Sequence, residues 1–323
     1  MTVAVARNPY ATNVSTSLIA AAGRLGIPAR PVDLPSLRLG IGPLGDLAVT
    51  DSDGPIAPAS LAPYLLFGFP AAAHALRALA RTGHTQNPVD AVLLADDKAA
   101  AAYRLARAGV PQVRTEVCPF DAGQVSAVAA EIGYPVVVKR AHGAQGRWVR
   151  RAAGPEALAA ALAELAQEGP GALIVQPEVV ESAGTSIRAV LTGGRLLAVT
   201  ERRAAAPEWR SNIAGGAAQC RAELTGEEAE LVRGAAAALG LGHAGVDLLR
   251  TGQGPRVLEV NSCPDFTSMQ PHYQADLAEA VLRASLLPGP ALPALVRRSS
   301  GTTAPGPRTR PPTARRRSRA WPR

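Results

Sequence analysis

The chain has 323 residues, 47% hydrophobic and 19% charged, a composition typical of a globular protein with a large core. Its net charge of +8 does not indicate a nucleic-acid-binding surface, because residues 297–323 contain nine arginines and no acidic residue, which leaves the rest close to neutral. Without a long apolar run we expect neither a signal peptide nor a membrane span, and three cysteines without paired spacing indicate reduced thiols in a cytoplasmic protein.

The first part of the chain predicts an α/β unit. Residues 2–6 and 29–34 have the short apolar pattern of buried strands, and residues 13–24 between them suit a helix. A β-α-β opening of this kind is typical of half of a doubly wound sheet. We expect residues 35–60, which are rich in Gly, Pro, Asp and Ser, to be irregular, and residues 70–82 to form a helix.

Helices and strands alternate through the rest of the chain. An acidic pair before Lys98 opens a helix over residues 97–108, and Thr225 with Glu228 forms a capping box at the start of another. The remaining predicted elements are strands at 133–139, 172–176, 185–191 and 196–201, the last two joined as a hairpin, and helices at 155–167 and 274–286. Beyond residue 288 the Pro- and Arg-rich composition predicts disorder.

A second hairpin carries the first candidate site. Strands at residues 246–250 and 256–260 flank the polar turn 251–255. If the turn closes symmetrically, Asp247 lies directly opposite Glu259, with Cβ atoms roughly 5 Å apart. Like charges placed in this way are destabilising unless something binds between them.

The alternation of side chains along this hairpin predicts a metal site. Asn261 shares the face of Glu259, whereas Leu248, Leu258 and Val260 point into a core. Two carboxylates and an amide oxygen are hard ligands that suit a magnesium ion shared with substrate phosphates. The alternative is a solvated acidic face on an edge hairpin.

A lysine that ends an apolar strand is the second candidate. Lys139 follows residues 133–138 and precedes a loop that carries Gly143 and Gly146. The backbone N–H groups of such a loop can surround phosphate oxygens, and a lysine adds a charge beside them. The order differs from that of the P-loop, in which the lysine follows the glycines. The alternative is a solvated strand end.

Eight short segments follow one another between residues 94 and 286. They are Ala95-Asp96-Asp97-Lys98, Pro135-Val136-Val137-Val138-Lys139, Gly143-Ala144-Gln145-Gly146, Ile187-Arg188, Glu201-Arg202-Arg203, Arg210-Ser211-Asn212, Gly245-Val246-Asp247-Leu248-Leu249 and Leu258-Glu259-Val260-Asn261-Ser262. In this order and spacing they resemble the ATP-grasp ligases, and within them the RimK-like family of ribosomal-protein glutamate ligases and carrier-protein ligases of lysine biosynthesis.

This resemblance implies roles for the matched residues. Lys98 and Lys139 would contact the ATP phosphates, and Arg202 would meet the γ-phosphate and the acyl phosphate. The residues implied in catalysis are Arg202, Lys139 and Arg210. The other residues implied in nucleotide or acceptor binding are Gln145 and Gly146 on a lid loop, Pro177 and Glu178 on a linker, and Arg210, Ser211 and Asn212. The implied magnesium ligands are Asp247, Glu259 and Asn261.

Some positions depart from the family pattern. Ser186 stands where an acidic residue usually precedes the Ile-Arg pair, and Arg147 with Trp148 interrupts the small residues of the lid loop. Only residues 213–214 separate Asn212 from the glycine pair, without the basic residues of the ribosomal-protein enzymes, so we expect a different acceptor site. Cys263 is expected to be an inert, packed thiol, because ATP-grasp chemistry needs no enzyme nucleophile.

The implied fold is α+β with α/β parts: an ATP-grasp fold with an N-terminal, doubly wound-like pre-ATP-grasp domain. The expected divisions are an N-terminal domain over residues 1–94, a lid subdomain with a central helix over 95–175, a metal and nucleotide subdomain over 176–287, and a disordered basic tail over 288–323.

The implied activity is an ATP-dependent ligation of a carboxylic acid to an amine through an acyl phosphate. An amino acid such as glutamate would be added to a peptide, a carrier protein or a small carboxylic acid. The implied cofactors are ATP and Mg²⁺, for which Mn²⁺ can substitute, and relatives often form homodimers or homotetramers. Neither a membrane nor a nucleic acid is an expected partner, the basic tail apart.

Two alternatives stay open. One is a nucleotide-binding or nucleic-acid-associated protein without ligase activity, in which the basic tail makes the main contacts. The other is a degenerate ATP-grasp site, because of Ser186 and Trp148.

Overall fold

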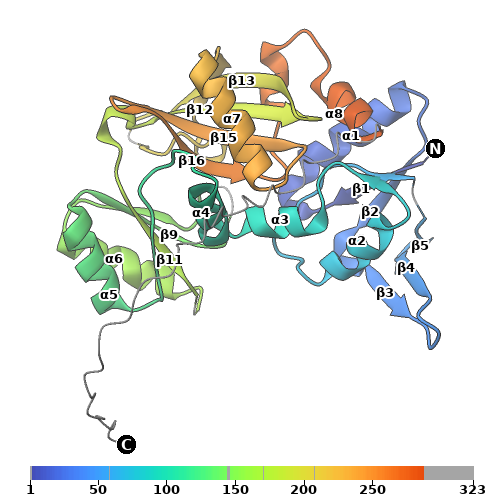
Figure 1. Cartoon of the computed structure of the whole chain (residues 1–323), viewed down its shortest axis with the longest axis horizontal. Coiled ribbons are helices and arrows are strands. Elements are labelled where there is room, and N and C mark those ends of the chain that lie inside the picture. Colours follow the sequence, from blue (N-terminus) through green and yellow to red (C-terminus); the bar gives the residue numbers. More distant parts are fainter. Residues whose placement is uncertain (1, 58, 144–145, 170, 207, 287–323) are drawn as a thin grey trace, which may run out of the picture. The chain divides into compact units, whose positions relative to one another are not determined.

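The computed structural model describes residues 2–57, 59–143, 146–169, 171–206 and 208–286 (Figure 1). Four β-sheets and the helices around them make up this described part of the chain. The predicted disordered tail lies outside these residues, as does Gln145 of the predicted lid loop. Within the described ranges no helix is both long enough and apolar enough to cross a bilayer.

The chain begins with the predicted β-α-β unit. The strand β1 (Val3–Arg7) pairs in parallel with β2 (Ala29–Asp33), and α1 (Thr12–Arg24) connects them. On the other side of β1 the parallel sheet continues through β6 (Ser60–Leu61) and β7 (His84–Thr85). The predicted strands and helix of the opening are confirmed.

The prediction that residues 35–60 are irregular is wrong. The strands β3 (Arg38–Ile41), β4 (Leu47–Asp51) and β5 (Gly54–Pro55) form a separate antiparallel sheet. Its apolar alternation is weak, because Val49 is the one buried apolar residue in β3 and β4. An ion pair connects this sheet to β2, since Asp51 accepts hydrogen bonds from Arg30 at 2.7 and 2.8 Å. Periodicity does not reveal such a pair.

Helices join this region to the next sheet. The predicted helices are confirmed as α2 (Ala72–Ala80) and α4 (Lys98–Arg107), and the Asp97 side chain caps α4 by accepting from two amides. Two helices were not predicted, α3 (Val89–Asp96) and α5 (Ala122–Ile132). In α3 the apolar residues lie all round the helix, which removes the amphipathic period that would indicate it.

A four-stranded antiparallel sheet follows, in the order β10 (Val149–Ala152), β9 (Val136–Arg140), β11 (Leu173–Pro177) and β8 (Glu116–Cys118). The helices α5 and α6 (Pro155–Ala166) lie together beside it (Figure 1). Val136 and Val138 of β9 pack into the core with these helices. Val137 and Lys139 alternate with them and therefore face the opposite side of the sheet.

The last sheet has five antiparallel strands, in the order β14 (Ala218–Arg221), β13 (Arg195–Arg203), β12 (Thr185–Thr192), β15 (Ala244–Thr251) and β16 (Gly254–Asn261). The helix α7 (Gly226–Ala238), which begins at the predicted capping box of Thr225 and Glu228, packs on one face together with α4. The helix α8 (Leu277–Leu286) packs with α1 against residues of the other face.

A buried asparagine fastens the loop before α3 to both ends of the last hairpin. The Asn87 side chain is fully buried, donates hydrogen bonds to the carbonyl oxygens of His243 and Ser262 at 2.7 Å each, and accepts from the His243 amide at 2.8 Å. These bonds join segments more than 150 residues apart in the sequence.

We therefore predict that Asn87→Ala lowers the free energy of unfolding by roughly 2–4 kcal/mol, because it leaves three buried backbone groups without partners. Urea unfolding followed by circular dichroism measures the change. Thr225→Ala, which removes only the cap of α7, is the control and should cost about 1 kcal/mol. An equal, small effect of both substitutions would contradict the tethering role of Asn87.

Candidate active site

A cleft of about 550 Å³ is lined by residues of both the antiparallel four-stranded sheet, which contains β9, and the five-stranded sheet. Its floor follows from the alternation of side chains in the five-stranded sheet. Ile187, Val246 and Val260 belong to the core beneath α7. The residues that alternate with them face the cleft instead: Ser186, Arg188, Arg202, Asp247, Glu259 and Asn261.

The predicted pairing of Asp247 with Glu259 is present, but the hairpin reaches it in a different way. Thr251 pairs with Gly254, so the turn has two central residues instead of the expected five. A β-bulge then restores the register, because Leu248 pairs with Val257 and Leu258 is the extra residue.

The bulge corrects one side-chain assignment. Leu258 was expected in the core, yet it lines the cleft beside Glu259, and Val257 is buried in its place with 1% of its surface exposed. A bulge shifts all residues beyond it by one position, which a symmetric hairpin does not allow for. The predicted metal face therefore keeps its two carboxylates and gains an apolar neighbour.

The predicted magnesium ligands fit that ion by the chemistry of their donor atoms. Asp247 and Glu259 offer carboxylate oxygens, and Asn261 offers an amide oxygen on the same wall of the cleft. Nowhere in the described ranges are three or more His, Cys, Asp or Glu side chains grouped to hold a metal. A magnesium ion at this face would thus depend on further oxygen ligands from water and phosphates.

Two buried arginines share the carboxylate of Asp247. Both oxygens of Asp247 accept hydrogen bonds from Arg188, which stands opposite it on β12, and the Arg202 guanidinium lies 3.8 Å from the same carboxylate. Only 8% of Arg188 and 6% of Arg202 is exposed. The sequence places Arg188 in a motif without indicating its role; the register of β12 with β15 brings it opposite Asp247.

The two guanidiniums differ in their electrostatic situation. Burial would lower the pKa of Arg188, but Asp247 raises it above its ordinary value. Burial and the neighbouring Arg188 lower the pKa of Arg202 to about 10. The Nε of Arg202 also has no hydrogen-bond partner within the described residues. Arg202 is therefore a buried cation with incomplete compensation, which favours the binding of an anion.

Two lysines face these groups from the other elements. Lys139 is 6% exposed, and burial lowers its pKa to about 8 although the charge of Glu259 opposes this. The Lys98 ammonium donates to the Gly143 carbonyl at 2.5 Å and lies 3.4 Å from Glu259. Both predicted phosphate-binding lysines thus lie in the cleft on the side of the metal face.

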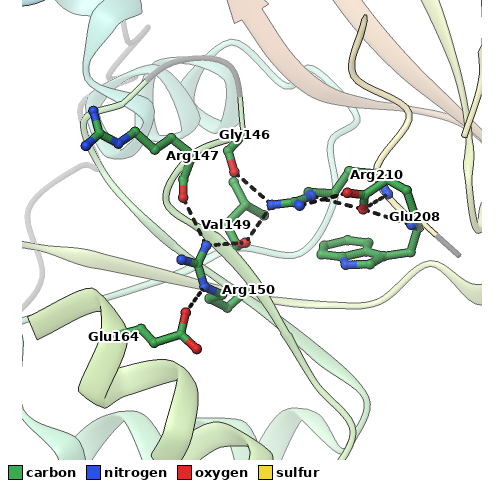
Figure 2. A network of polar contacts seen from close by, with 8 residues as sticks. Gly146, Arg147, Val149, Arg150, Glu164, Glu208 and Arg210 are labelled. Atoms are coloured by element: carbon green, nitrogen blue, oxygen red, sulfur yellow. Dashed lines mark hydrogen bonds and ion pairs between the residues drawn. The ribbon is translucent and has the colours of Figure 1, made fainter. Parts of the chain in front are cut away.

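Arg210 makes contacts other than those expected of a nucleotide ligand. Figure 2 shows its guanidinium between Glu208 and the main chain that follows the lid loop. It donates to the carbonyl oxygens of Gly146 and Val149 at 3.1 and 3.4 Å, and it pairs with Glu208 at 2.8 Å. Next to Val149 on β10, Arg150 forms an ion pair with Glu164.

The Glu208 carboxylate holds this guanidinium in place. Hydrogen bonds from the Arg210 side chain and from the amides of Arg210 and Trp209 lower the pKa of Glu208 to about 2. Gly146 has a φ of +71°, and a Cβ at this position would come within 3.1 Å of Asn212. Glycine therefore suits this position, where the lid loop comes close to residues 208–212.

The remaining predicted residues line the cleft with mixed pairings. Ser211 shares a hydrogen bond of 2.7 Å with Ser186, the residue that departs from the family pattern. Glu178 follows Pro177 at the end of β11 and forms an ion pair with Arg151 at 2.7 Å. Asn212 also lines the cleft.

Cys263 has the environment of an unreactive thiol. Burial, together with the charges of Asp96 and Asp265, raises its pKa to about 12. The thiolate is therefore disfavoured at neutral pH, in agreement with the expectation of an inert, packed cysteine.

Comparisons with known proteins place this geometry in a family. The model of the RimK-like ATP-grasp domain matches residues 95–285. A probable alpha-L-glutamate ligase of Xanthomonas axonopodis pv. citri (strain 306) is 35% identical over 203 residues, which cover 62% of this chain and 67% of the relative.

Solved structures have the same fold. A RimK domain protein from Sphaerobacter thermophilus DSM 20745 superimposes with a TM-score of 0.65 and 24% identity, covering 89% of this chain and all of that one. The ATP-grasp ligase PsnB, in complex with a variant of its minimal precursor, Mg and ADP, has a TM-score of 0.65 and 18% identity, covering 88% of this chain and 97% of that one.

We predict that Glu208→Gln loosens the end of the lid loop, because it removes the charge that orients Arg210. A half-buried ion pair contributes up to about 1 kcal/mol. The fraction of molecules in which the lid loop is detached from Arg210 should therefore rise about fivefold. Limited trypsin digestion at Arg147, Arg150 and Arg151 measures it.

The matched control is Glu201→Gln, since Glu201 pairs with Arg203 at 2.8 Å across the same sequence spacing but outside the cleft. Equal cleavage rates in Glu208→Gln and Glu201→Gln would contradict the role of Glu208.

Proposed function

The chain belongs to the RimK-like family of ATP-grasp ligases. From this premise we propose that its cleft binds ATP with Mg²⁺ and joins a carboxylic acid to an amine. The observation that carries the proposal is the charge arrangement of the cleft. Two carboxylates lie opposite each other, and four cations surround them: Lys98, Lys139, Arg188 and Arg202.

In this proposal the phosphates occupy the space between the lysines and the arginines. Lys139 and Lys98 take the nucleotide phosphates from the side of β9 and α4, and Arg202 takes the transferring phosphoryl group from the side of β13. The incomplete compensation of Arg202 supports this role, since its Nε has a hydrogen bond to give. The backbone at Pro177 and Glu178 and the residues Ser211 and Asn212 would hold the rest of the nucleotide.

The metal ligands would be Asp247, Glu259 and Asn261. When bound there, magnesium would neutralise charge on the phosphates and make the phosphorus more electrophilic. Without magnesium, bidentate pairing with Arg188 fixes the orientation of the Asp247 carboxylate. PsnB, with the same fold, has been solved with Mg and ADP, which supports this cofactor pair.

The reaction then proceeds in two displacements. The substrate carboxylate takes the γ-phosphoryl group of ATP and becomes an acyl phosphate, and the amine displaces phosphate to form the amide. Arg202 and Arg188 would stabilise the negative charge on the phosphoryl oxygens, because buried donors act strongly in a cleft of low dielectric. Arg210, instead of touching phosphate, would keep the lid loop near the cleft so that water does not reach the acyl phosphate.

Several finer points are part of the proposal and rest on the resemblance alone. They are the substitution of Mn²⁺ for Mg²⁺, a homodimeric or homotetrameric state, an amino-acid or peptide substrate, and the division into subdomains at residues 94, 175 and 287.

Release of ADP tests the proposed function. The full chain is incubated with ATP and Mg²⁺ and with pairs of N-acetyl amino acids as acids and amino-acid methyl esters as amines, and products are identified by mass spectrometry. ADP release that requires both an acid and an amine, with a matching amide, is the expected result. ADP release without any amide would point to a degenerate site, and no release with any pair would overturn the proposal.

We predict that Glu259→Gln lowers the rate of amide formation at least about 100-fold, because it removes a carboxylate of the proposed magnesium site. The protein should stay folded, because the substituted side chain is partly exposed and the new amide has the same shape. Thermal unfolding and ADP release are measured on the same sample. Glu131→Gln, which changes a solvent-exposed carboxylate on α5, is the control. Turnover of Glu259→Gln close to that of the unchanged chain would rule out its role at the metal.

A further inference from the structure

The part of the cleft wall that precedes the family match is uncharged and largely apolar. Among the described residues before position 95, four line the cleft: Tyr10, Asn13, Leu65 and Phe67. Three of them are apolar or aromatic, and none carries a charge. They lie outside residues 95–285, which the RimK-like model matches. The N-terminal part of the chain therefore contributes this wall, which we call the aromatic wall, and the matched family domain does not.

The two aromatic rings form a defined pair. The ring centroids of Tyr10 and Phe67 are 5.0 Å apart, and their planes meet at 67°, an edge-to-face arrangement. Tyr10 is 46% exposed, and Phe67 is half-buried. An exposed aromatic pair on the wall of a cleft presents apolar surface that a ligand can cover.

A buried asparagine holds the segments that carry both rings. The Asn8 side chain is 2% exposed and donates to the carbonyl oxygens of Leu65 and Phe67 at 2.9 Å each. Its own oxygen accepts from the Tyr10 amide at 2.8 Å. One side chain thus satisfies backbone groups on both sides of the pair, so the two backbone segments that carry the rings are held together without a ligand.

Close approach of the two segments requires a glycine. Gly68 has a φ of +84°, and a Cβ there would lie 2.9 Å from the Tyr10 ring. Any larger residue would collide with the Tyr10 ring unless one of them moved, and it would also be strained at this φ. Gly68 therefore allows the Tyr10 ring to lie against this segment.

Two further carboxylates, Asp96 and Asp265, line the cleft. Asp265 acts on the buried Arg188 and Arg202, whereas Asp96 lies beside the aromatic wall, because the Leu66 amide is among the groups that act on its pKa. The Oδ2 atom of Asp96 is buried and has no hydrogen-bond partner within the described residues. A substrate ammonium group next to this wall can therefore pair with Asp96.

We infer that Tyr10, Leu65 and Phe67 form the side-chain subsite of the amine substrate and select an amine with an apolar or aromatic side chain. This inference rests on the proposed ligase function and adds the class of the amine. An acidic side chain such as that of glutamate would meet two rings and a leucine here and would lose its hydration. A glutamate-like side chain is thus disfavoured at this position.

The test uses the full chain with ATP, Mg²⁺ and the acid that gives the fastest ADP release. The amines are the methyl esters of phenylalanine, leucine, glycine and glutamate. We expect kcat/KM for phenylalanine and leucine esters to exceed that for glycine and glutamate esters about 10- to 100-fold, the range that burial of an apolar side chain provides.

Substitutions then locate the selectivity. Tyr10→Ala and Phe67→Ala should each lower kcat/KM for the phenylalanine ester about tenfold and change that for the glycine ester less than about threefold. The KM for ATP should stay the same. Tyr10→Phe, which keeps the ring, should retain the selectivity. Tyr103→Ala, which removes a 62% exposed tyrosine on α4 outside the cleft, is the matched control.

Calorimetric titration with phenylalanine methyl ester in the presence of ADP and Mg²⁺ separates the two levels of the argument. Binding that weakens in Tyr10→Ala supports the subsite even if no acid gives turnover, in which case only the ligase function fails. A preference for the glutamate ester, an equal loss with all amines, or selectivity that follows the N-acetyl acid instead of the amine would overturn the subsite.

Discussion

The Asp247 carboxylate and the two arginines that share it are the interaction on which the site depends. Buried cations are costly unless an opposite charge is near, and here one carboxylate serves both Arg188 and Arg202. Arg188 takes both carboxylate oxygens, so Arg202 is left with a more distant contact to Asp247 and with an Nε that has no hydrogen-bond partner within the described residues. The cleft therefore favours an anion beside Arg202, and the register of β12 with its neighbours creates this arrangement.

Alternation along strands accounts for how much of this site the sequence predicts. Asp247, Glu259 and Asn261 follow from a period of two and a hairpin, and the structure places all three on one face. The position of Leu258 does not follow, because a bulge depends on backbone geometry that no residue type announces. The role of Arg188 was likewise missed, since its partner Asp247 is 59 residues away and belongs to a strand whose neighbour must first be known.

The N-terminal region shows the same limit more strongly. Its β-α-β opening follows from local patterns, whereas the sheet of β3, β4 and β5 was expected to be irregular. Val49 is the one buried apolar residue of β3 and β4, and the ion pair of Arg30 with Asp51 connects this sheet to β2. The sequence does not indicate the aromatic pair either. Tyr10 and Phe67 lie together because Asn8 contacts residues 57 and 59 positions away in the chain.

These limits separate two kinds of specificity in one cleft. The charged face is built from neighbouring strands of a single sheet, so a family that keeps the sheet keeps the chemistry of phosphoryl transfer. The aromatic wall is built from the short 3-10 helix Pro9–Ala11 and from the segment between β6 and α2, which a buried asparagine connects, so it can change without disturbing the register of the sheet. Lys98 connects the lid loop to the metal face, because its ammonium donates to the Gly143 carbonyl and pairs with Glu259. In the proposed reaction, closure over the phosphates would therefore be the same for different amines, and the aromatic wall of the N-terminal region would select the amine.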